Sequence, residues 1–299
     1  MRRDIEFKSE GVTCRGWFYR PDAMAKSQRL PTIVMAHGFG GVKEVRLDKF
    51  AEGFAAAGFQ CLVFDYRTTG SSDGVPRQQW MPDIQIADFR NAVSFARGLP
   101  EVDPERIGLW GTSFGGGHVI SVGAVDRRVK CIVALVPFLD GRESAKVMIG
   151  EAALGEGMKQ MIAERERIAA GGAPAQVPIA ALNGEPQAIL NDPAEIAWAR
   201  LAAVPVPTWV NWVTSPSVEA LFEYCPIALI DRVAPTPLLL IASETDAVIP
   251  LALSQAAFAR ALEPKRLKVL PFAHFEIYEA PARSAAISEA VDWFAKHLR

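Results

Sequence analysis

The sequence lacks the features that mark membrane, secreted or nucleic-acid-binding proteins. No apolar run approaches the roughly 18 residues of a transmembrane helix, and the first eight residues (MRRDIEFK) hold no apolar core of signal-peptide length. No block of basic residues occurs, and the net charge is -2. A nucleic-acid-binding protein would instead show a basic patch. We therefore expect a cytoplasmic protein that binds neither nucleic acid nor a membrane.

Cysteine is also scarce. The chain has 4 cysteines, which are scattered and form no C-x-x-C pair or Cys/His cluster. This excludes a disulfide framework and gives no support for a zinc site. The run Gly115-Gly116-Gly117 is too short for a phosphate-binding loop and follows a serine turn. We expect neither a metal ion nor a cofactor.

What the sequence has is an alternation of strand-like and helix-like segments in 299 residues that are 50% hydrophobic. Nearly continuous apolar runs predict buried strands at 31–36, 60–66, 106–110, 130–136, 236–242 and 266–270. Helical spacing predicts helices at 43–57, 83–98, 253–262 and 282–297, and a hairpin is expected over 3–8 and 12–19. This order predicts an α/β fold, a doubly wound and mostly parallel sheet with helices on both faces.

The alternation stops between residues 139 and 232, where no strong strand pattern is found. Residues 144–169 are rich in Ala, Met and Glu and are expected to be helical. Asp192-Pro193 and Ser215-Pro216 each resemble an N-cap followed by proline at the first helical position. We therefore predict a core made of residues 1–138 and 233–299, with a helical cap inserted between them.

A G-x-S-x-G pentapeptide occurs at residues 111–115, with Ser113 at its centre. An apolar run precedes it and a run of small residues follows, which predicts a strand, a sharp turn and a helix. Glycines on both sides let the backbone make such a turn, and the helix N-terminus behind the serine presents unpaired N–H groups. Ser113 is thus the candidate nucleophile.

A nucleophilic serine needs a base, and the chain has only 4 histidines. His118 lies on the predicted helix after Ser113 and is expected to pack. His37 is expected to brace a glycine-rich loop, and His297 lies in the last helical turn. His274 follows the last strand, at the sheet edge where parallel sheets collect their sites, so it is the candidate base.

The acid that orients this base should follow another strand at the same edge. Asp246 does so, in the loop after the strand at 236–242. Glu244 in the same loop and Asp140 after the earlier strand are alternatives. With Asp246 preferred, the order along the chain is Ser113, Asp246, His274.

This order, the serine turn and the loop His37-Gly38-Phe39-Gly40-Gly41 resemble the α/β-hydrolase fold over nearly the whole chain. Residues 37–44, 64–67 and 273–278 are similar to those of dienelactone-hydrolase-like and acyl-peptidase-like serine esterases, including a group related to fungal polyketide transferases. Dienelactone hydrolases proper use a cysteine where this chain has serine, and Ser243 stands where such loops often have glycine.

The resemblance implies an oxyanion hole. Its donors would be the backbone N–H groups of Phe39, in the glycine loop, and Phe114, directly after the nucleophile. Two such N–H groups stabilise the negatively charged oxygen of a tetrahedral intermediate.

The function expected is hydrolysis of a small-molecule carboxylic ester or thioester through an acyl-enzyme. Two alternatives stay open: an acyltransferase on the same triad, and a non-catalytic binding protein of this fold. The apolar content of residues 139–232 favours a medium-sized apolar or aromatic acyl group, and Trp209 or Trp212 is a candidate for substrate contact, with plain packing as the alternative. The oligomeric state is left open, with a homodimer as one alternative to a monomer.

Overall fold

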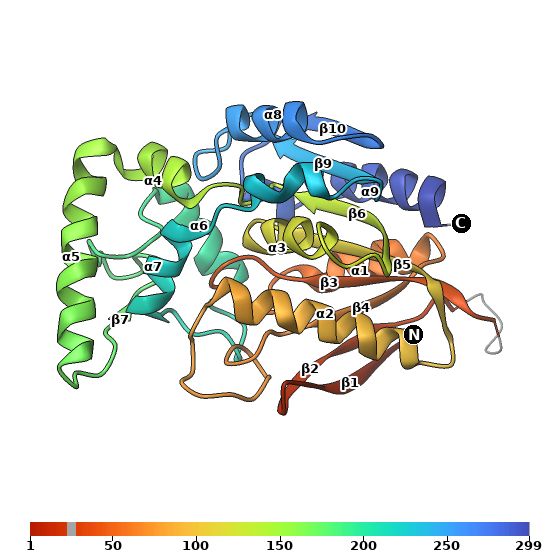
Figure 1. Ribbon diagram of the computed structural model, residues 1–299, viewed down its shortest axis with the longest axis horizontal. Coiled ribbons are helices and arrows are strands. Elements are labelled where there is room, and N and C mark those ends of the chain that lie inside the picture. Colours follow the sequence, from red (N-terminus) through yellow and green to blue (C-terminus); the bar gives the residue numbers. More distant parts are fainter. Residues whose placement is uncertain (23–27, 299) are drawn as a thin grey trace.

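An eight-stranded sheet forms the centre of the computed structural model, which describes residues 1–22 and 28–298 (Figure 1). The strand order is β1-β2-β4-β3-β5-β6-β9-β10. Only the pairings of β1 with β2 and of β2 with β4 are antiparallel; all others are parallel. The strands are β1 (Arg2–Ser9), β2 (Val12–Tyr19), β3 (Leu30–Ala36), β4 (Gln60–Phe64), β5 (Val102–Thr112), β6 (Val129–Leu135), β9 (Leu238–Ser243) and β10 (Lys265–Leu270).

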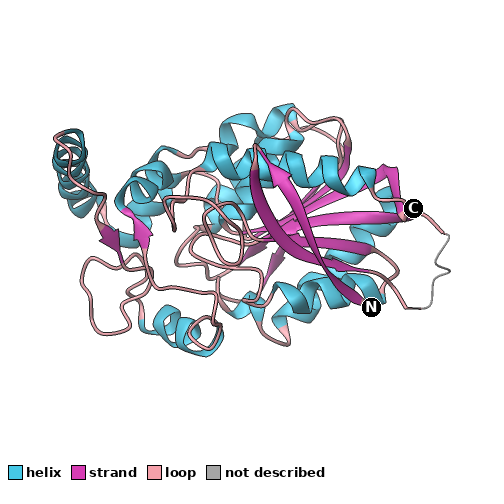
Figure 2. Ribbon diagram, turned by 90° about the horizontal axis from the view of Figure 1, so that it is seen from below, coloured by secondary structure: helices cyan, strands magenta, loops and turns pink. Residues whose placement is uncertain are grey.

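Helices cover both faces of this sheet (Figure 2). On one face lie α2 (Pro82–Gly98), α3 (Phe114–Gly123) and α8 (Leu251–Arg260), and on the other lie α1 (Leu47–Ala56) and α9 (Ala282–Leu298). Alternate residues of β3 serve the two faces: Val34 packs with the α2 and α3 side, and Ile33 with the α1 and α9 side. The predicted doubly wound, mostly parallel α/β fold is confirmed.

One helix starts later than its apolar spacing predicts. The helix expected from residue 43 begins at Leu47, and residues 43–46 form turns instead. The backbone N–H of Lys43 donates to Asp65 Oδ1 at 2.7 Å, and Arg46 has a left-handed backbone with φ 69°. The left-handed backbone of Arg46 is incompatible with a continuous α-helix through residues 43–47.

Between β6 and β9 the chain forms mainly helices, which lie to one side of the sheet in Figure 1. They are α4 (Gly141–Ile149), α5 (Glu151–Ala169), α6 (Pro193–Ala202), α7 (Ser215–Glu223) and the 3-10 helix η1 (Pro226–Arg232). Two short strands, β7 (Gln176–Val177) and β8 (Val213–Thr214), pair antiparallel. The segment returns to the body of the molecule through η1, which packs against α3. Residues 139–232 are called the inter-strand segment below.

The helical block expected at 144–169 is in fact two helices. Gly150, with φ 81°, separates α4 from α5. The cap predicted at Asp192 is confirmed, since Asp192 and Glu195 form a capping box with proline at the first helical turn. The N-cap predicted at Ser215 is wrong by one residue, because the N-cap of α7 is Thr214. The Ser215 hydroxyl instead donates a hydrogen bond to Glu164 Oε1 at 2.6 Å.

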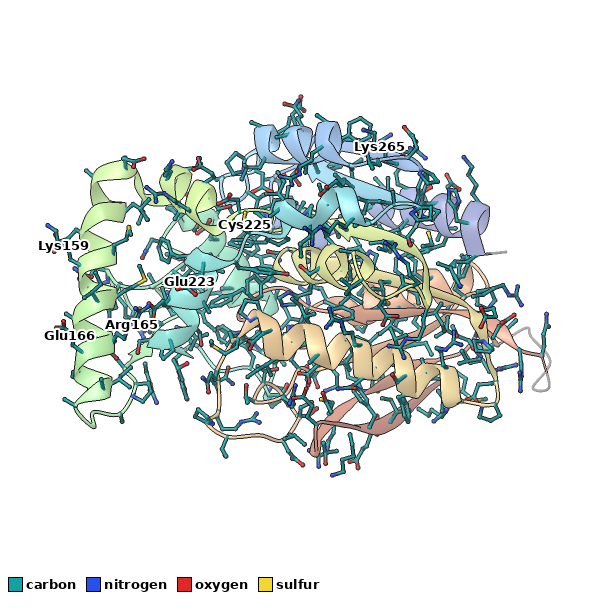
Figure 3. All side chains as sticks on the ribbon, viewed as in Figure 1. Lys159, Arg165, Glu166, Glu223, Cys225 and Lys265 are labelled. Atoms are coloured by element: carbon teal, nitrogen blue, oxygen red, sulfur yellow. The ribbon has the colours of Figure 1, made fainter. Side chains whose placement is uncertain are left out.

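Helix α5 is the least buried long helix of the inter-strand segment. Leu154 is its single buried residue among 19. The charged side chains of Lys159, Arg165 and Glu166 are spread along it in Figure 3. Its contacts to other helices are made to α4 and α7, and Arg165 reaches to within 4.0 Å of Glu223 at the end of α7.

Candidate active site

Ser113 lies between the last residue of β5 and the first residue of α3, and its backbone has φ 53° and ψ -118°. Residues with a side chain rarely adopt a positive φ, so the surroundings must hold this turn in place. The N–H of Ser113 donates to the carbonyl of Leu135 at 2.9 Å, and its carbonyl accepts from Phe138 N at 2.8 Å and Gly117 N at 3.2 Å. These bonds fix the half-buried serine at the carboxyl edge of the sheet.

The flanking glycines are required by close packing. A β-carbon on Gly111 would lie 2.1 Å from the carbonyl oxygen of Gly115, and one on Gly115 would lie 2.6 Å from that of His37. A β-carbon on Gly38 would lie 2.9 Å from Ser113 Cβ. Larger residues at these positions would push the serine turn and the glycine loop apart.

His274 and Asp246 meet at the same sheet edge, from the loops that follow β10 and β9. Nδ1 of His274 lies 2.8 Å from Oδ2 of Asp246, and their side chains are only 4% and 2% exposed. The other carboxylate oxygen accepts from Val248 N at 2.9 Å and Ile249 N at 2.6 Å. With Nδ1 held by the carboxylate, Nε2 is the imidazole nitrogen left for proton exchange.

The two alternative acids have other positions. Asp140 is the N-cap of α4, where its carboxylate accepts from Glu143 N at 3.0 Å. Glu244 is exposed at the surface. The structure therefore pairs His274 with Asp246, as the sequence order favours.

The other three histidines occupy positions that fit a structural role. His118 is fully buried, with one ring nitrogen 2.8 Å from Tyr224 Oη and the other 2.8 Å from Gln85 Oε1. Burial, with a smaller effect of the nearby His37, lowers the pKa of His118 to about 3, so its ring is neutral. Nδ1 of His37 lies 3.1 Å from the next carbonyl in the glycine loop. His297 is in the last turn of α9.

The glycine loop and the start of α3 lie side by side. The ring of Phe39 packs edge-on against that of Phe114, with centroids 5.3 Å apart, and against that of Trp80 at 5.2 Å. Phe114 is the first residue of α3, so its N–H has no acceptor within the helix. The two residues expected to donate to an oxyanion are thus neighbours beside Ser113.

A buried ion pair supports the glycine loop. Nζ of Lys43 lies 2.8 Å from Oδ2 of Asp65, which also accepts from the backbone N–H of Ser71 at 2.9 Å. Burial alone would raise the pKa of Asp65, but attraction to Lys43 and His37 outweighs it, and the pKa lies below its usual value. The pair ties the loop after β3 to the loop after β4.

Ser113 and His274 line one apolar cavity of about 100 Å³. The sheet side contributes the glycine loop, and the inter-strand segment contributes apolar side chains. These are Met148, Ile179, Ile189, Leu190, Trp198, Ala199, Ala203, Trp209 and Leu221. Of the two tryptophans singled out from the sequence, Trp209 lines the cavity and donates from Nε1 to the carbonyl of Gly40 at 2.8 Å. Trp212 lies outside this lining.

Sequence reasoning missed three aromatic residues at the cavity. Trp198 on α6 packs against Phe275 and Tyr278, with ring centroids 4.7 and 5.3 Å away. The Tyr278 hydroxyl lies 2.7 Å from Thr112 Oγ1, which joins the histidine loop to the end of β5. Phe275 and Tyr278 could have been found from their closeness to His274 in the sequence, whereas Trp198 depends on how α6 is placed.

No group of three or more His, Cys, Asp or Glu side chains within residues 1–22 and 28–298 could hold a metal ion. Over the same ranges, no helix has both the length and the hydrophobicity needed to cross a bilayer.

The strand order, the serine turn and the paired His274 and Asp246 define an α/β hydrolase architecture. The sequence model for the alpha/beta hydrolase fold matches residues 31–281, so the chain belongs to this family.

Particular relatives are similar over almost the whole chain. The quorum-quenching protein AidA of Acinetobacter baumannii is 36% identical, with 98% of this chain and 94% of AidA covered. The thiohydrolase aneE of Aspergillus aculeatus is 32% identical, with 89% of this chain and 83% of aneE covered. Among solved structures, DcsB in complex with its substrate analogue superimposes with a TM-score of 0.85 and 27% identity, covering 100% of this chain and 99% of DcsB. These similarities support a hydrolase.

Proposed function

We propose that the protein is a serine hydrolase that cleaves a carboxylic ester or thioester through an acyl-enzyme intermediate. The observation that carries this proposal is the 2.8 Å contact between His274 Nδ1 and Asp246, beside a strained Ser113 that shares a cavity with His274. In such a set the serine is the nucleophile, the imidazole is the base, and the carboxylate orients the base.

In the proposed mechanism, Ser113 Oγ attacks the substrate carbonyl while His274 Nε2 takes its proton. Asp246 holds the imidazole in the tautomer that leaves Nε2 unprotonated. The N–H groups of Phe39 and Phe114 bind the oxyanion, each worth about 3–4 kcal/mol in the transition state. His274 then protonates the departing oxygen or sulfur. Water attacks the acyl-enzyme in the same way and releases the acid.

The acyl group is proposed to occupy the apolar cavity beside Ser113, with the inter-strand segment acting as its cap. This assignment is supported by the side chains of Met148, Ile179 and Trp209, which lie opposite the glycine loop in the lining. Such a wall favours an apolar or aromatic acyl group. The name of aneE, a thiohydrolase, supports including thioesters among the substrates.

Labelling with a fluorophosphonate, followed by intact-mass measurement and peptide mapping, tests the nucleophile. We expect one adduct on Ser113, and no adduct on Ser113→Ala. The same variant should lose at least about 10⁴-fold in kcat on p-nitrophenyl esters. Its melting temperature should match the wild type. Near-normal turnover by a folded Ser113→Ala protein would overturn the proposal.

Hydrolysis and acyl transfer share the acyl-enzyme and differ in what attacks it. Products should therefore be analysed with and without an added alcohol or amine. Free acid as the main product in both cases supports the hydrolase. A main product in which the acceptor carries the acyl group supports the acyltransferase.

A further inference from the structure

A second cavity, of about 540 Å³, adjoins the first one at His274. It is bounded by the start of α6, the loop after β9 and the histidine loop as far as the start of α9. Its lining comprises Asp192, Ala194, Glu195, Ala197, Trp198, Leu201, Ala247, Val248, Phe272, Ala273, His274, Phe275, Glu276, Glu279, Ala280, Pro281 and Ala282.

The two cavities have four lining residues in common. His274, Val248, Trp198 and Phe275 line both of them, whereas Ser113 lines only the apolar one. Among the described residues, the buried indole N–H of Trp198 has no hydrogen-bond acceptor. The shared lining therefore combines the candidate base with an unused hydrogen-bond donor.

The second cavity differs from the first in charge. Four carboxylates line it, and its lining contains no lysine or arginine within the described part of the chain. Glu279 is neutralised from outside by Arg46, at 2.5 Å, and by Arg283, at 3.6 Å. Asp192 and Glu276 are the two exposed carboxylates whose charge is not neutralised in this way.

Glu195 is the buried member of this set. Its carboxylate accepts from the N–H of Asp192 at 3.3 Å in the capping box of α6. Burial raises the pKa of Glu195, and repulsion from Asp192 adds to this, while the nearby His274 acts in the opposite direction. The exposed carboxylates of Asp192 and Glu276 would attract a cation entering the cavity and repel an anion.

We propose that the second cavity binds the non-acyl half of the substrate and selects neutral or cationic groups over anionic ones. This inference rests on the proposed function. When the tetrahedral intermediate collapses, the bond from the carbonyl carbon to the leaving oxygen or sulfur breaks, and His274 donates its proton to that atom. The leaving atom must therefore lie against His274, and the second cavity, which His274 also lines, is where the remainder of the leaving group fits.

Three esters of one acyl group test the charge preference. The alcohols are choline, its uncharged isostere 3,3-dimethylbutanol, and a sulfonate-bearing alcohol of similar size. We expect kcat/KM for the cationic and neutral esters to exceed that of the anionic ester by about tenfold at low ionic strength. The difference should shrink as salt screens the exposed carboxylates.

Variants locate this effect. Glu276→Gln and Asp192→Asn should each reduce the preference about two- to threefold. Glu244→Gln is the matched control, because Glu244 is exposed at the same sheet edge but lies outside the lining. It should leave the preference unchanged. A preference that persists unchanged in both cavity variants would overturn the inference.

Filling the cavity gives an independent test. Ala197 is exposed on α6 and lines only the second cavity. Ala197→Trp should raise KM for esters of bulky alcohols and leave the preference for acyl chain length unchanged. An altered acyl preference with unchanged alcohol preference would reverse the assignment of the two cavities.

The outcomes separate this inference from the function on which it rests. If Ser113 is labelled and all three esters are cleaved equally well, the cavity assignment fails and the hydrolase stands. If Ser113 takes no label and no ester is cleaved, the proposed function itself fails.

Discussion

The sheet edge and the inter-strand segment form opposite walls of one cavity but are built differently. On the sheet side, Ser113, Asp246 and His274 come from loops anchored by backbone hydrogen bonds and closely packed glycines. In the inter-strand segment, α5 exposes nearly its whole length and α4 buries only two of its residues. The candidate catalytic groups are therefore held by the deeply packed part, whereas the wall facing them can vary without disturbing their geometry.

The largest effect expected is at the sheet edge, in Asp246→Asn. The amide would donate to Nδ1 and hold the imidazole in the wrong tautomer, which should lower kcat by about 10⁴-fold. Steady-state kinetics on a p-nitrophenyl ester measures this. Asp140→Ala is the control from the inter-strand segment: it should cost about 1 kcal/mol of stability as a lost helix cap and leave kcat unchanged. The opposite pattern would move the acid to Asp140.

The second prediction concerns stability and the ion pair behind the glycine loop. Asp65→Asn removes the buried counter-charge of Lys43, which keeps only the partly exposed carboxylate of Glu44 at 2.7 Å, and should lower the free energy of unfolding by about 3 kcal/mol. Urea denaturation measures the change. Lys43→Met removes the other partner and is a useful comparison, since it replaces the charge by an apolar chain of similar length. A loss below about 1 kcal/mol for Asp65→Asn would show that the pair contributes as little as a surface pair.

The pair of Lys43 and Asp65 also makes the stability of the fold depend on pH. The folded pKa of Asp65 lies below its unfolded value, so the carboxylate stabilises the fold. This stabilisation is fully present above the unfolded value of about 3.9 and is lost as pH falls through the lower folded value. Between about pH 5 and about pH 2, the wild type should therefore lose stability that Asp65→Asn has already lost. Parallel stability curves for the two proteins over this range would contradict the assignment.

The contrast between the two regions also explains what the sequence could predict. Buried strands leave continuous apolar runs, so the strands at 31–36 and 130–136 were found within a residue or two. Loops at strand ends then placed His274 and Asp246 at one edge. The sequence favoured Asp246 as the acid but left Asp140 and Glu244 open, because both follow strands too and only the folded loops show which carboxylate faces the imidazole.

The inter-strand segment was harder to predict because tertiary contacts decide its details. The helical pattern runs through Gly150, and only the backbone shows the break there. Ser215 has the composition of an N-cap, but Glu164 from α5 binds its hydroxyl. The sequence gives no reason to prefer Trp209 over Trp212 as a substrate contact, and it does not single out Trp198. Which of them faces the cavity depends on how the helices pack.

A smaller effect is expected from Trp209→Phe, within the cavity wall. It removes the hydrogen bond from the indole to Gly40 and should cost about 1 kcal/mol of stability. It should also shift the preferred chain length in a series of p-nitrophenyl esters, because Trp209 lines the cavity. Trp212→Phe is the matched control, outside the lining, and its profile should stay as in the wild type. A uniform loss of activity in both variants would mean that the tryptophans only pack the segment.

The smallest effect is expected at α5, in Arg165→Ala. Arg165 pairs with Glu219 on α7, but its own side chain is 63% exposed. An exposed pair is screened by water and must restrain two long side chains, so its loss should lower the free energy of unfolding by less than about 1 kcal/mol. Urea denaturation of Arg165→Ala beside Asp65→Asn compares one ion pair from each region directly. Equal losses would remove the distinction drawn between them, because the inter-strand segment would then depend on its ion pairs as strongly as the sheet edge does.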